Sequence, residues 1–191
     1  RNTEVAVIHQ GYGDVEAVLR SAPLVVELEL GIGRHSGVPL EARGAIGRYD
    51  ASRDILELHG AAKVPHRNRD LLARMLKLTP SSIHVHEAHV GGGFGIRGEL
   101  YPEDVLVCVG AMRLGRPVKW IEDRREHLIA ANHSREIDCE LEIACRRDGT
   151  ILGMRGRIYG DMGAYIRTNG GVVPAKAAQF RDQRAVARAV E

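Results

Sequence analysis

The sequence predicts an α+β fold, with mixed and antiparallel sheets and packed helices. The first observation is the composition: 44% of the 191 residues are hydrophobic and 27% are charged, as in globular proteins with a core. The second is that segments of alternating apolar and polar residues are interspersed with segments of helical spacing. The third is the low aromatic content of 4%, which leaves Val, Ile, Leu and Ala to form most of the core. This balance argues against intrinsic disorder and against a fibrous fold.

The first third of the chain predicts one helix followed by three strands. Asp14 stands where its carboxylate can cap the free amides of a helix over 16–22. Residues 24–32 alternate between apolar and other side chains, which predicts a half-buried strand. Two further strands, over 45–49 and 55–58, flank a polar stretch and are expected to form a hairpin.

Proline and glycine mark the elements that follow. A helix is predicted over 69–78, where leucines recur on one face, and a strand over 83–90. Pro102 opens the next helix at a position where its missing N–H costs nothing, and Gly115 ends that helix. Because no repeat and no linker is visible, the chain is treated as one α+β unit. The remaining predicted strands lie over 118–122, 136–144 and 151–159, the last two as a hairpin.

The charge balance narrows the classes of partner. Lys and Arg number 27 and Asp and Glu number 25, so the net charge of +2 provides no clustered basic face for nucleic acid. No run approaches the ~18 apolar residues of a membrane span. The three cysteines show no CxxC spacing and are expected to be reduced thiols. We therefore expect a cytoplasmic protein without nucleic-acid or membrane partners.

The sharpest chemical feature is the stretch Gly91-Gly92-Gly93-Phe94-Gly95. Consecutive glycines let backbone N–H groups approach an anionic or oxo group without a Cβ in the way, and they permit positive φ. A bulky Phe94 among them can line one side of a pocket. From the residues alone, a tight turn or bulge between a strand and a helix explains the same pattern. The spacing matches neither a dinucleotide-binding fingerprint nor a P-loop.

The histidines and cysteines carry weaker signals. His84 and His86 share one face of the expected strand, whereas Glu87 and His89 share the other, so a third ligand for the pair must come from elsewhere. A solvated strand face is the simpler interpretation, and no metal ligand is assigned. Cys108 falls on the apolar face of a predicted helix, where we expect a buried thiol that behaves as a small hydrophobe.

Five segments of the chain recur together in one known family. They are 39–45 (Pro-Leu-Glu-Ala-Arg-Gly-Ala), 64–66 (Val-Pro-His), 90–95 (Val-Gly-Gly-Gly-Phe-Gly), 115–119 with 122–124 (Gly-Arg-Pro-Val-Lys and Glu-Asp-Arg) and 160–165 (Gly-Asp-Met-Gly-Ala-Tyr). In order and spacing they resemble the large, molybdenum-binding subunit of the molybdenum hydroxylases, the family of xanthine dehydrogenase, aldehyde oxidase and aerobic carbon monoxide dehydrogenase. The resemblance implies that 1–180 form the N-terminal part of its molybdenum-cofactor-binding domain and that 181–191 are an atypical tail.

The resemblance also implies cofactor contacts. In this family the Phe-Gly of the glycine loop lies against the molybdenum centre, so Gly92, Gly93, Phe94 and Gly95 are expected to contact a molybdenum–molybdopterin cofactor. Lys63 stands where xanthine dehydrogenase-like members commonly have a glutamine that hydrogen-bonds the oxo ligand, and we assign it to the same site. An amine there donates but cannot accept, and it adds a positive charge. A solvated lysine at a strand end is the alternative.

Two substrate-site candidates follow the loop. Glu99 stands one residue beyond the place of a substrate-contacting glutamate in purine-oxidising members, and Arg97 could pair with Glu99 or with a phosphate. An exposed acid at the entry to a helix is the alternative for Glu99. No catalytic residue is assigned, because the family's catalytic glutamate is expected after the point where this sequence ends.

The implied function is that of an oxidoreductase acting on an aldehyde, an N-heterocycle or carbon monoxide. Its electrons would pass through iron–sulfur clusters to a flavin on partner subunits. The chain by itself is expected to show no turnover, and apolar surface left exposed predicts a homo-oligomer. A non-enzymatic truncated homologue, acting as a binding or assembly module, is the alternative.

Overall fold

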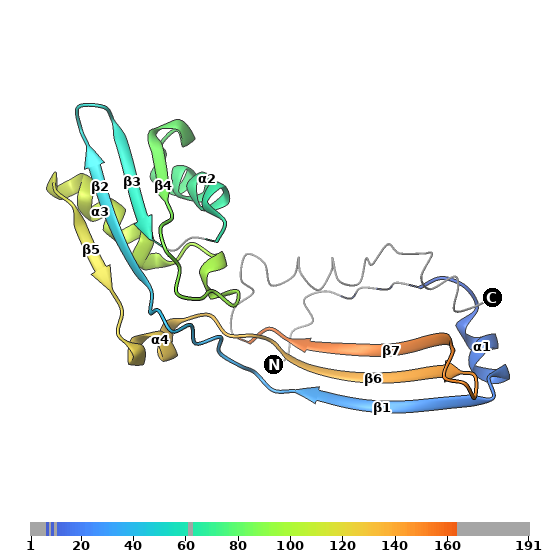
Figure 1. The fold of residues 1–191 in the computed structure, drawn as a ribbon. Coiled ribbons are helices and arrows are strands. Elements are labelled where there is room, and N and C mark those ends of the chain that lie inside the picture. The colour runs from blue at the N-terminus through green and yellow to red at the C-terminus, as the bar shows by residue number, and fades with distance from the viewer. Residues whose placement is uncertain (1–6, 8, 10, 61–62, 164–191) are drawn as a thin grey trace. The chain divides into compact units, whose positions relative to one another are not determined.

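The computed structural model describes residues 7, 9, 11–60 and 63–163. The chain divides into two compact units, one formed by residues 1–35 together with 134–191 and the other by residues 36–133. The sequence analysis treats the chain as one unit, because the two crossings between units carry no linker-like composition. Each unit has its own sheet and its own helices (Figure 1), and each is described by itself. The predicted boundary at residue 180 lies outside the described residues.

The unit of residues 36–133 contains a four-stranded mixed sheet in the order β4-β3-β2-β5. Its antiparallel β2–β3 hairpin was expected, and Asp50 closes the turn by accepting hydrogen bonds from Ser52. β3 and β4 pair in parallel, and the helix α2 provides the crossover connection that a parallel pair requires. The strands are β2 (Gly44–Asp50), β3 (Ile55–Gly60), β4 (Ile83–His86) and β5 (Val118–Ile121).

Two helices, α2 (Pro65–Leu76) and α3 (Pro102–Leu114), pack on one face of this sheet and form the core with it. Leu56 and Leu58 of β3 point into this core. Because successive residues of a strand point to opposite faces, Glu57 and His59 lie on the other face of the sheet. Cys108 of α3 is fully buried, which confirms the expected buried thiol. The buried core side chains are Ala45, Leu56, Leu58, Leu72, Ala73, Ile83, Val107 and Cys108.

Proline and glycine predicted the ends of some helices and strands more accurately than those of others. α3 begins at Pro102 and ends at Gly115, whose φ of +63° is the left-handed conformation expected of a C-terminal glycine. α2 begins at Pro65, four residues before the predicted start at 69, because proline suits the first helical turn. The strand predicted over 83–90 ends at His86. Short 3-10 turns, Pro80–Ser82 and Ile96–Gly98, flank this region.

A further helix in this unit, α4 (Arg124–Ala130), has no counterpart in the sequence analysis. It begins with a capping box in which Asp123 accepts from the Glu126 amide at 2.8 Å and Glu126 accepts from the Asp123 amide at 2.8 Å. The Asp-Arg-Arg-Glu signal of residues 123–126 was present in the sequence, directly after the predicted strand 118–122, but no element was predicted there.

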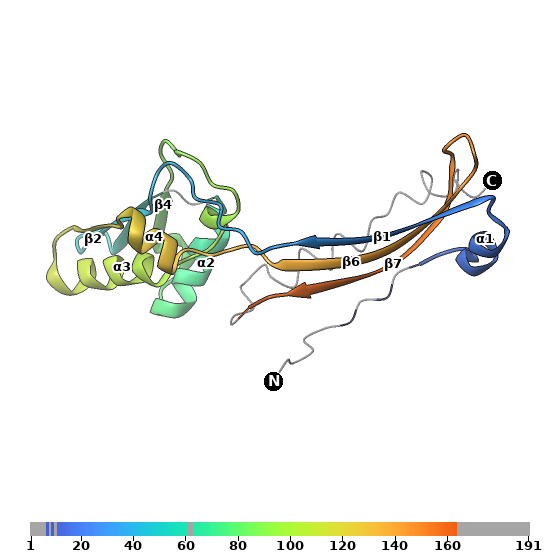
Figure 2. The same ribbon diagram turned by 90° about the horizontal axis from the view of Figure 1, so that it is seen from below.

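The second unit is an antiparallel sheet in the order β1-β6-β7, with β1 (Leu24–Ile32), β6 (Glu136–Cys145) and β7 (Ile151–Asp161). These three strands run side by side along their length (Figures 1 and 2). α1 (Val15–Ser21) is capped by Asp14, which accepts from the Ala17 amide at 3.0 Å as predicted. The half-burial predicted for β1 is wrong, because every residue of this strand is exposed.

The two sheets and their helices confirm the predicted α+β class. None of the helices in the described ranges is long and apolar enough to cross a lipid bilayer.

Candidate functional site

The glycine stretch forms a loop between β4 and the 3-10 turn Ile96–Gly98, within the unit of residues 36–133. Its backbone takes positive φ at Gly92 (+107°), Phe94 (+46°) and Gly95 (+90°). Glycine adopts these angles without steric cost, whereas Phe94 adopts a conformation that is uncommon for a residue with a Cβ. The loop therefore has a defined shape that the glycines make possible.

Glu41 and Arg97 fix the base of this loop. The Gly91 amide donates to a Glu41 carboxylate oxygen at 2.8 Å, and the Glu41 amide donates to the Gly91 carbonyl at 3.1 Å. Arg97 is 4% exposed and donates to the carbonyl oxygens of Glu41 (2.8 Å) and Ala42 (3.0 Å) and to the Glu41 carboxylate (3.1 Å). A Cβ on Gly91 would lie 2.5 Å from the Glu41 Cβ, so only glycine allows this close approach.

Above this base, the backbone amides of Gly92, Gly93, Phe94 and Gly95 make no hydrogen bond to any residue that the structure describes. The carbonyls of Gly93 and Gly95 are engaged, since they accept from the Ile96 and Gly98 amides at 2.8 and 3.3 Å. Phe94 is 77% exposed, and its ring edge lies beside Gly92. The loop thus presents a run of unpaired N–H donors, which is the arrangement that binds anionic or oxo groups.

A buried ion-pair network supports the segment that carries Glu41. The Arg43 amide donates to Glu122 at 2.7 Å, and the Arg43 guanidinium contacts the other Glu122 oxygen through Nε at 2.9 Å and Nη2 at 2.7 Å. His127 Nδ1 also contacts the Glu122 carboxylate. The Arg43 guanidinium lies 3.9 Å from the centre of the Tyr101 ring, a cation–π contact. Glu122 and His127 are completely buried side chains.

This network sets the protonation of Glu122. Burial by itself raises the pKa of that carboxyl, but hydrogen bonds from the Arg43 side chain and amide and from His127 outweigh burial and hold the pKa below its usual value. Glu122 is therefore an anion at neutral pH and balances the buried charge of Arg43.

Residues 39–45 and 122–124 are far apart in sequence, but they meet here. Arg124 adds to the contact by donating to the carbonyls of Pro39 (2.8 Å) and Leu40 (2.7 Å). No role was predicted for Glu41, Arg43 or Glu122 from the sequence. Their only signal was membership of the segments that resemble the molybdenum hydroxylases, since Glu41 pairs with Arg97 across 56 residues and Arg43 with Glu122 across 79.

The structure places the remaining predicted site residues near the same loop. Lys63 is exposed, and its amide donates to the Arg97 carbonyl at 3.0 Å, which holds it beside the loop's C-terminal end. Glu99 is half-buried and accepts from Asn132 at 2.9 Å. Arg97 pairs with Glu41, and it also lines a small pocket with Glu99. That pocket is lined by Arg43, Gly44, Arg97, Glu99, Tyr101, Asp104 and Trp120.

Comparison with protein families gives a match to the molybdopterin cofactor-binding domain over residues 1–184. Two similar proteins are a subunit of a dehydrogenase complex and the large chain of a carbon monoxide dehydrogenase. The 6-hydroxypseudooxynicotine dehydrogenase complex subunit gamma of Paenarthrobacter nicotinovorans is 39% identical over 167 residues, covering 87% of this chain and 21% of the relative. The carbon monoxide dehydrogenase large chain of Hydrogenophaga pseudoflava is 32% identical over 158 residues, covering 81% of this chain and 20% of the relative. The chain thus spans about a fifth of the length of these relatives.

Solved structures agree with the family match. Quinoline 2-oxidoreductase from Pseudomonas putida 86 is similar with a TM-score of 0.68 and 35% identity, over 76% of this chain and 18% of that chain. The aldehyde oxidoreductase of Desulfovibrio gigas has a TM-score of 0.75 at 23% identity, over 85% of this chain and 18% of that chain, which supports the fold alone. The family match covers nearly the whole chain. This chain belongs to the molybdopterin cofactor-binding domain family of the molybdenum hydroxylases.

Proposed function

We propose that this chain forms part of the molybdopterin-binding wall of a molybdenum hydroxylase that oxidises an N-heterocycle, an aldehyde or carbon monoxide. The observation that carries the proposal is the run of unpaired amides from Gly92 to Gly95, held on the partly buried ion pair of Arg97 with Glu41. The names of the relatives support the substrate range, since they include nicotine 6-hydroxylase, quinoline 2-oxidoreductase and carbon monoxide dehydrogenase.

The residues of the loop fit a group rich in acceptor oxygens. Backbone N–H groups that have no acceptor within the protein can donate hydrogen bonds to such oxygens. A glycine backbone lets the bound group approach these N–H groups closely. A Cβ on Gly95 would have no described atom within 4 Å, so the space beside this amide is open. The bound molybdenum cofactor supplies two-electron redox chemistry, while the chain holds and orients it. Phe94 shields one side of the loop with its exposed ring.

The neighbours of the loop have distinct roles in this proposal. Lys63 brings a positive charge to the loop's C-terminal end and is placed to donate to an anionic oxygen. Arg97 and Glu99 line one pocket, which supports substrate contact by the Glu99 carboxylate. Because the Arg97 guanidinium is engaged with Glu41 and Ala42, Arg97 also holds the loop in position.

The proposal extends to partners. Relatives are named as subunit gamma of a dehydrogenase complex, as the large subunit of nicotine 6-hydroxylase and as the large chain of carbon monoxide dehydrogenase. We therefore expect this chain to work beside iron–sulfur and flavin subunits that carry electrons away from the cofactor.

Paired glycine substitutions test the loop. Gly95 and Gly149 have φ of +90° and +88°, and a Cβ on either would meet no atom of the described residues within 4 Å. Gly95→Ala and Gly149→Ala therefore impose the same backbone strain, of order 1 kcal/mol. The chain is produced in cells that make molybdopterin, and its molybdenum content and the fluorescence of the released, oxidised pterin are measured.

We expect Gly95→Ala to reduce bound molybdenum about tenfold or more, because the Cβ occupies the space next to the unpaired amides, while Gly149→Ala retains it. Equal retention by wild type and Gly95→Ala would refute the role of the loop. A wild-type chain that binds neither metal nor pterin would favour the binding-module alternative.

A further inference from the structure

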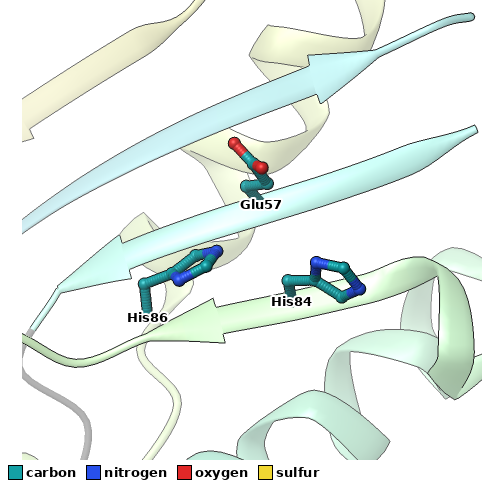
Figure 3. Close-up of side chains that lie close together, drawn as sticks. All are labelled: Glu57, His84 and His86. Carbon is teal, nitrogen blue, oxygen red and sulfur yellow. The ribbon is translucent and has the colours of Figure 1, made fainter. Parts of the chain in front are cut away.

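A second cluster of ligand-type side chains lies on the sheet face opposite α2 and α3. Glu57 of β3 and His84 and His86 of β4 lie close together on neighbouring strands (Figure 3). One oxygen of Glu57 and one ring nitrogen of each histidine all lie within 4.8 Å of one another. Both histidines are exposed, and the Glu57 side chain is 17% exposed.

The parallel register creates this cluster. Glu57 is the direct partner of His84, and His59 is the direct partner of His86. Because alternate residues of a strand share a face, the four side chains stand on the same side of the sheet. The sequence showed only the His84–His86 pair. The third ligand comes from a strand that precedes β4 by more than twenty residues.

Contacts around the cluster already hold its side chains in position. The rings of His59 and His86 stack with centroids 4.5 Å apart and an interplanar angle of 12°. His59 Nε2 lies 3.7 Å from one Glu57 oxygen. Arg48 approaches the same oxygen at 3.4 Å, but its side chain is more than half exposed, so this is a weak competing charge.

We propose that Glu57, His84 and His86 bind a divalent transition-metal ion of the Zn²⁺ class, with water in the fourth position. Two imidazoles and one carboxylate are a ligand set that zinc accepts in tetrahedral sites. Ligand bonds of about 2.0–2.2 Å place ligand atoms about 3.4 Å apart, so the exposed histidine rings close inward around the ion. Half-buried Glu57 is the fixed ligand. His59, which is partly exposed and stacks on His86, positions that ring.

The ion would join β3 to β4, which is an edge strand of four residues. A metal ion that binds the folded state but not the unfolded state stabilises the fold by mass action. The site is separate from the glycine loop, because its ligands lie on different elements and none of them is assigned to the cofactor. It is therefore tested independently of the proposed oxidoreductase function.

The test is zinc titration of the full chain, after removal of any affinity tag, by calorimetry and metal analysis. We expect one Zn²⁺ per chain, a higher melting temperature with zinc than with a chelator, and a Co²⁺ complex with visible absorption bands. His84→Ala and His86→Ala each remove a ligand and should weaken binding more than about 100-fold, whereas His59→Ala should weaken it about tenfold. Arg48→Ala should tighten binding severalfold, because it removes a competing positive charge.

His89→Ala is the matched control, since His89 is an exposed histidine three residues beyond His86 and outside the cluster. Its affinity should equal that of wild type. Glu57→Gln keeps the size of the side chain but removes its negative charge, so it should also weaken zinc binding. This variant still tests the site if an alanine variant fails to fold. No saturable binding by wild type, or equal affinity in wild type, His84→Ala and Glu57→Gln, would overturn the proposal.

Discussion

Glu122 shows how a single residue can hold a functional region together. Both of its carboxylate oxygens are used, one by the Arg43 amide and His127 and the other by the Arg43 guanidinium. Removing one member of a buried ion pair leaves the other charge without compensation, which is more costly than the pair is stabilising. Arg43 keeps a second partner in Glu103 at 3.3 Å, but that carboxylate is partly exposed.

We predict that Glu122→Gln lowers the free energy of unfolding by about 3 kcal/mol, the usual cost of breaking a buried pair. Glu142→Gln is the control, because the Arg155 and Glu142 side chains that pair there are 41% and 32% exposed, so this substitution should lower the free energy of unfolding much less. Urea denaturation of both variants measures the difference. Equal destabilisation by the two substitutions would show that the Glu122 network is no more important than a surface pair.

The same carboxylate predicts a pH dependence. Since the folded chain holds the pKa of Glu122 below the ordinary 4.5, its contribution to stability is complete above about pH 4.5. That contribution is lost as the pH falls through the lower, folded-state pKa. The difference in unfolding free energy between wild type and Glu122→Gln should therefore be constant from neutral pH to about 5 and shrink below 4.5. A difference that grows on acidification would contradict the assignment.

At the scale of elements, the packing of α3 on β2 depends on Gly47. A Cβ at this position would overlap the carbonyl group of Val107 and lie 2.8 Å from the Cys108 amide. The Val107 carbonyl and the Cys108 amide belong to the backbone of α3, which cannot move aside as a side chain can. The buried Val107 and Cys108 side chains belong to the same contact, so any displacement of α3 would also disturb the core.

We predict that Gly47→Ala destabilises the chain by about 3 kcal/mol, the upper part of the range for overpacked cores. Gly33→Ala is the control, because the nearest atom to its new Cβ is 3.9 Å away and its φ is not in the left-handed region. Thermal denaturation followed by circular dichroism distinguishes the two. A melting temperature for Gly47→Ala equal to that of wild type would mean that α3 shifts without cost.

Whole elements were predictable where local signals were strong. The limits of α3 follow from Pro102 and Gly115, which act through their own backbone angles. β4 ends at His86, four residues before the predicted end at Val90, because its pairing with β3 covers only Ile83 to His86. α4 was not predicted, although the capping box of Asp123 and Glu126 that marks its start is present in the sequence.

At the scale of the whole molecule, the sheet β1-β6-β7 is amphipathic. In register, one face carries Leu30 beside Cys139 and Ile158, and the other carries Glu29 beside Glu140 and Arg157. The apolar face is exposed in the structure: Leu30 is 50% exposed and Ile158 69%. The exposed large apolar side chains of this face include Leu24, Val26, Leu28, Leu30, Ile32, Met154 and Ile158. A surface of this kind favours association.

We therefore predict that the isolated chain self-associates. Light scattering should report an apparent mass that rises with concentration, and Ile158→Lys should lower it by placing a charge on the apolar face. Leu106→Lys is the control, because Leu106 is an exposed side chain on α3, 66% accessible and outside this sheet. A wild-type chain that remains monomeric at all concentrations would contradict the prediction.

The sequence by itself determined the α+β class, the limits of α3 and the position of the glycine loop, because these depend on backbone angles and hydrogen bonds between near neighbours. Tertiary structure alone decided which distant side chains meet. It joined Glu41 and Arg97 under the loop, Arg43 to Glu122, and Glu57 to His84 and His86. Strand order and register fix such contacts, and they arise from packing of the entire core, which local propensity does not encode.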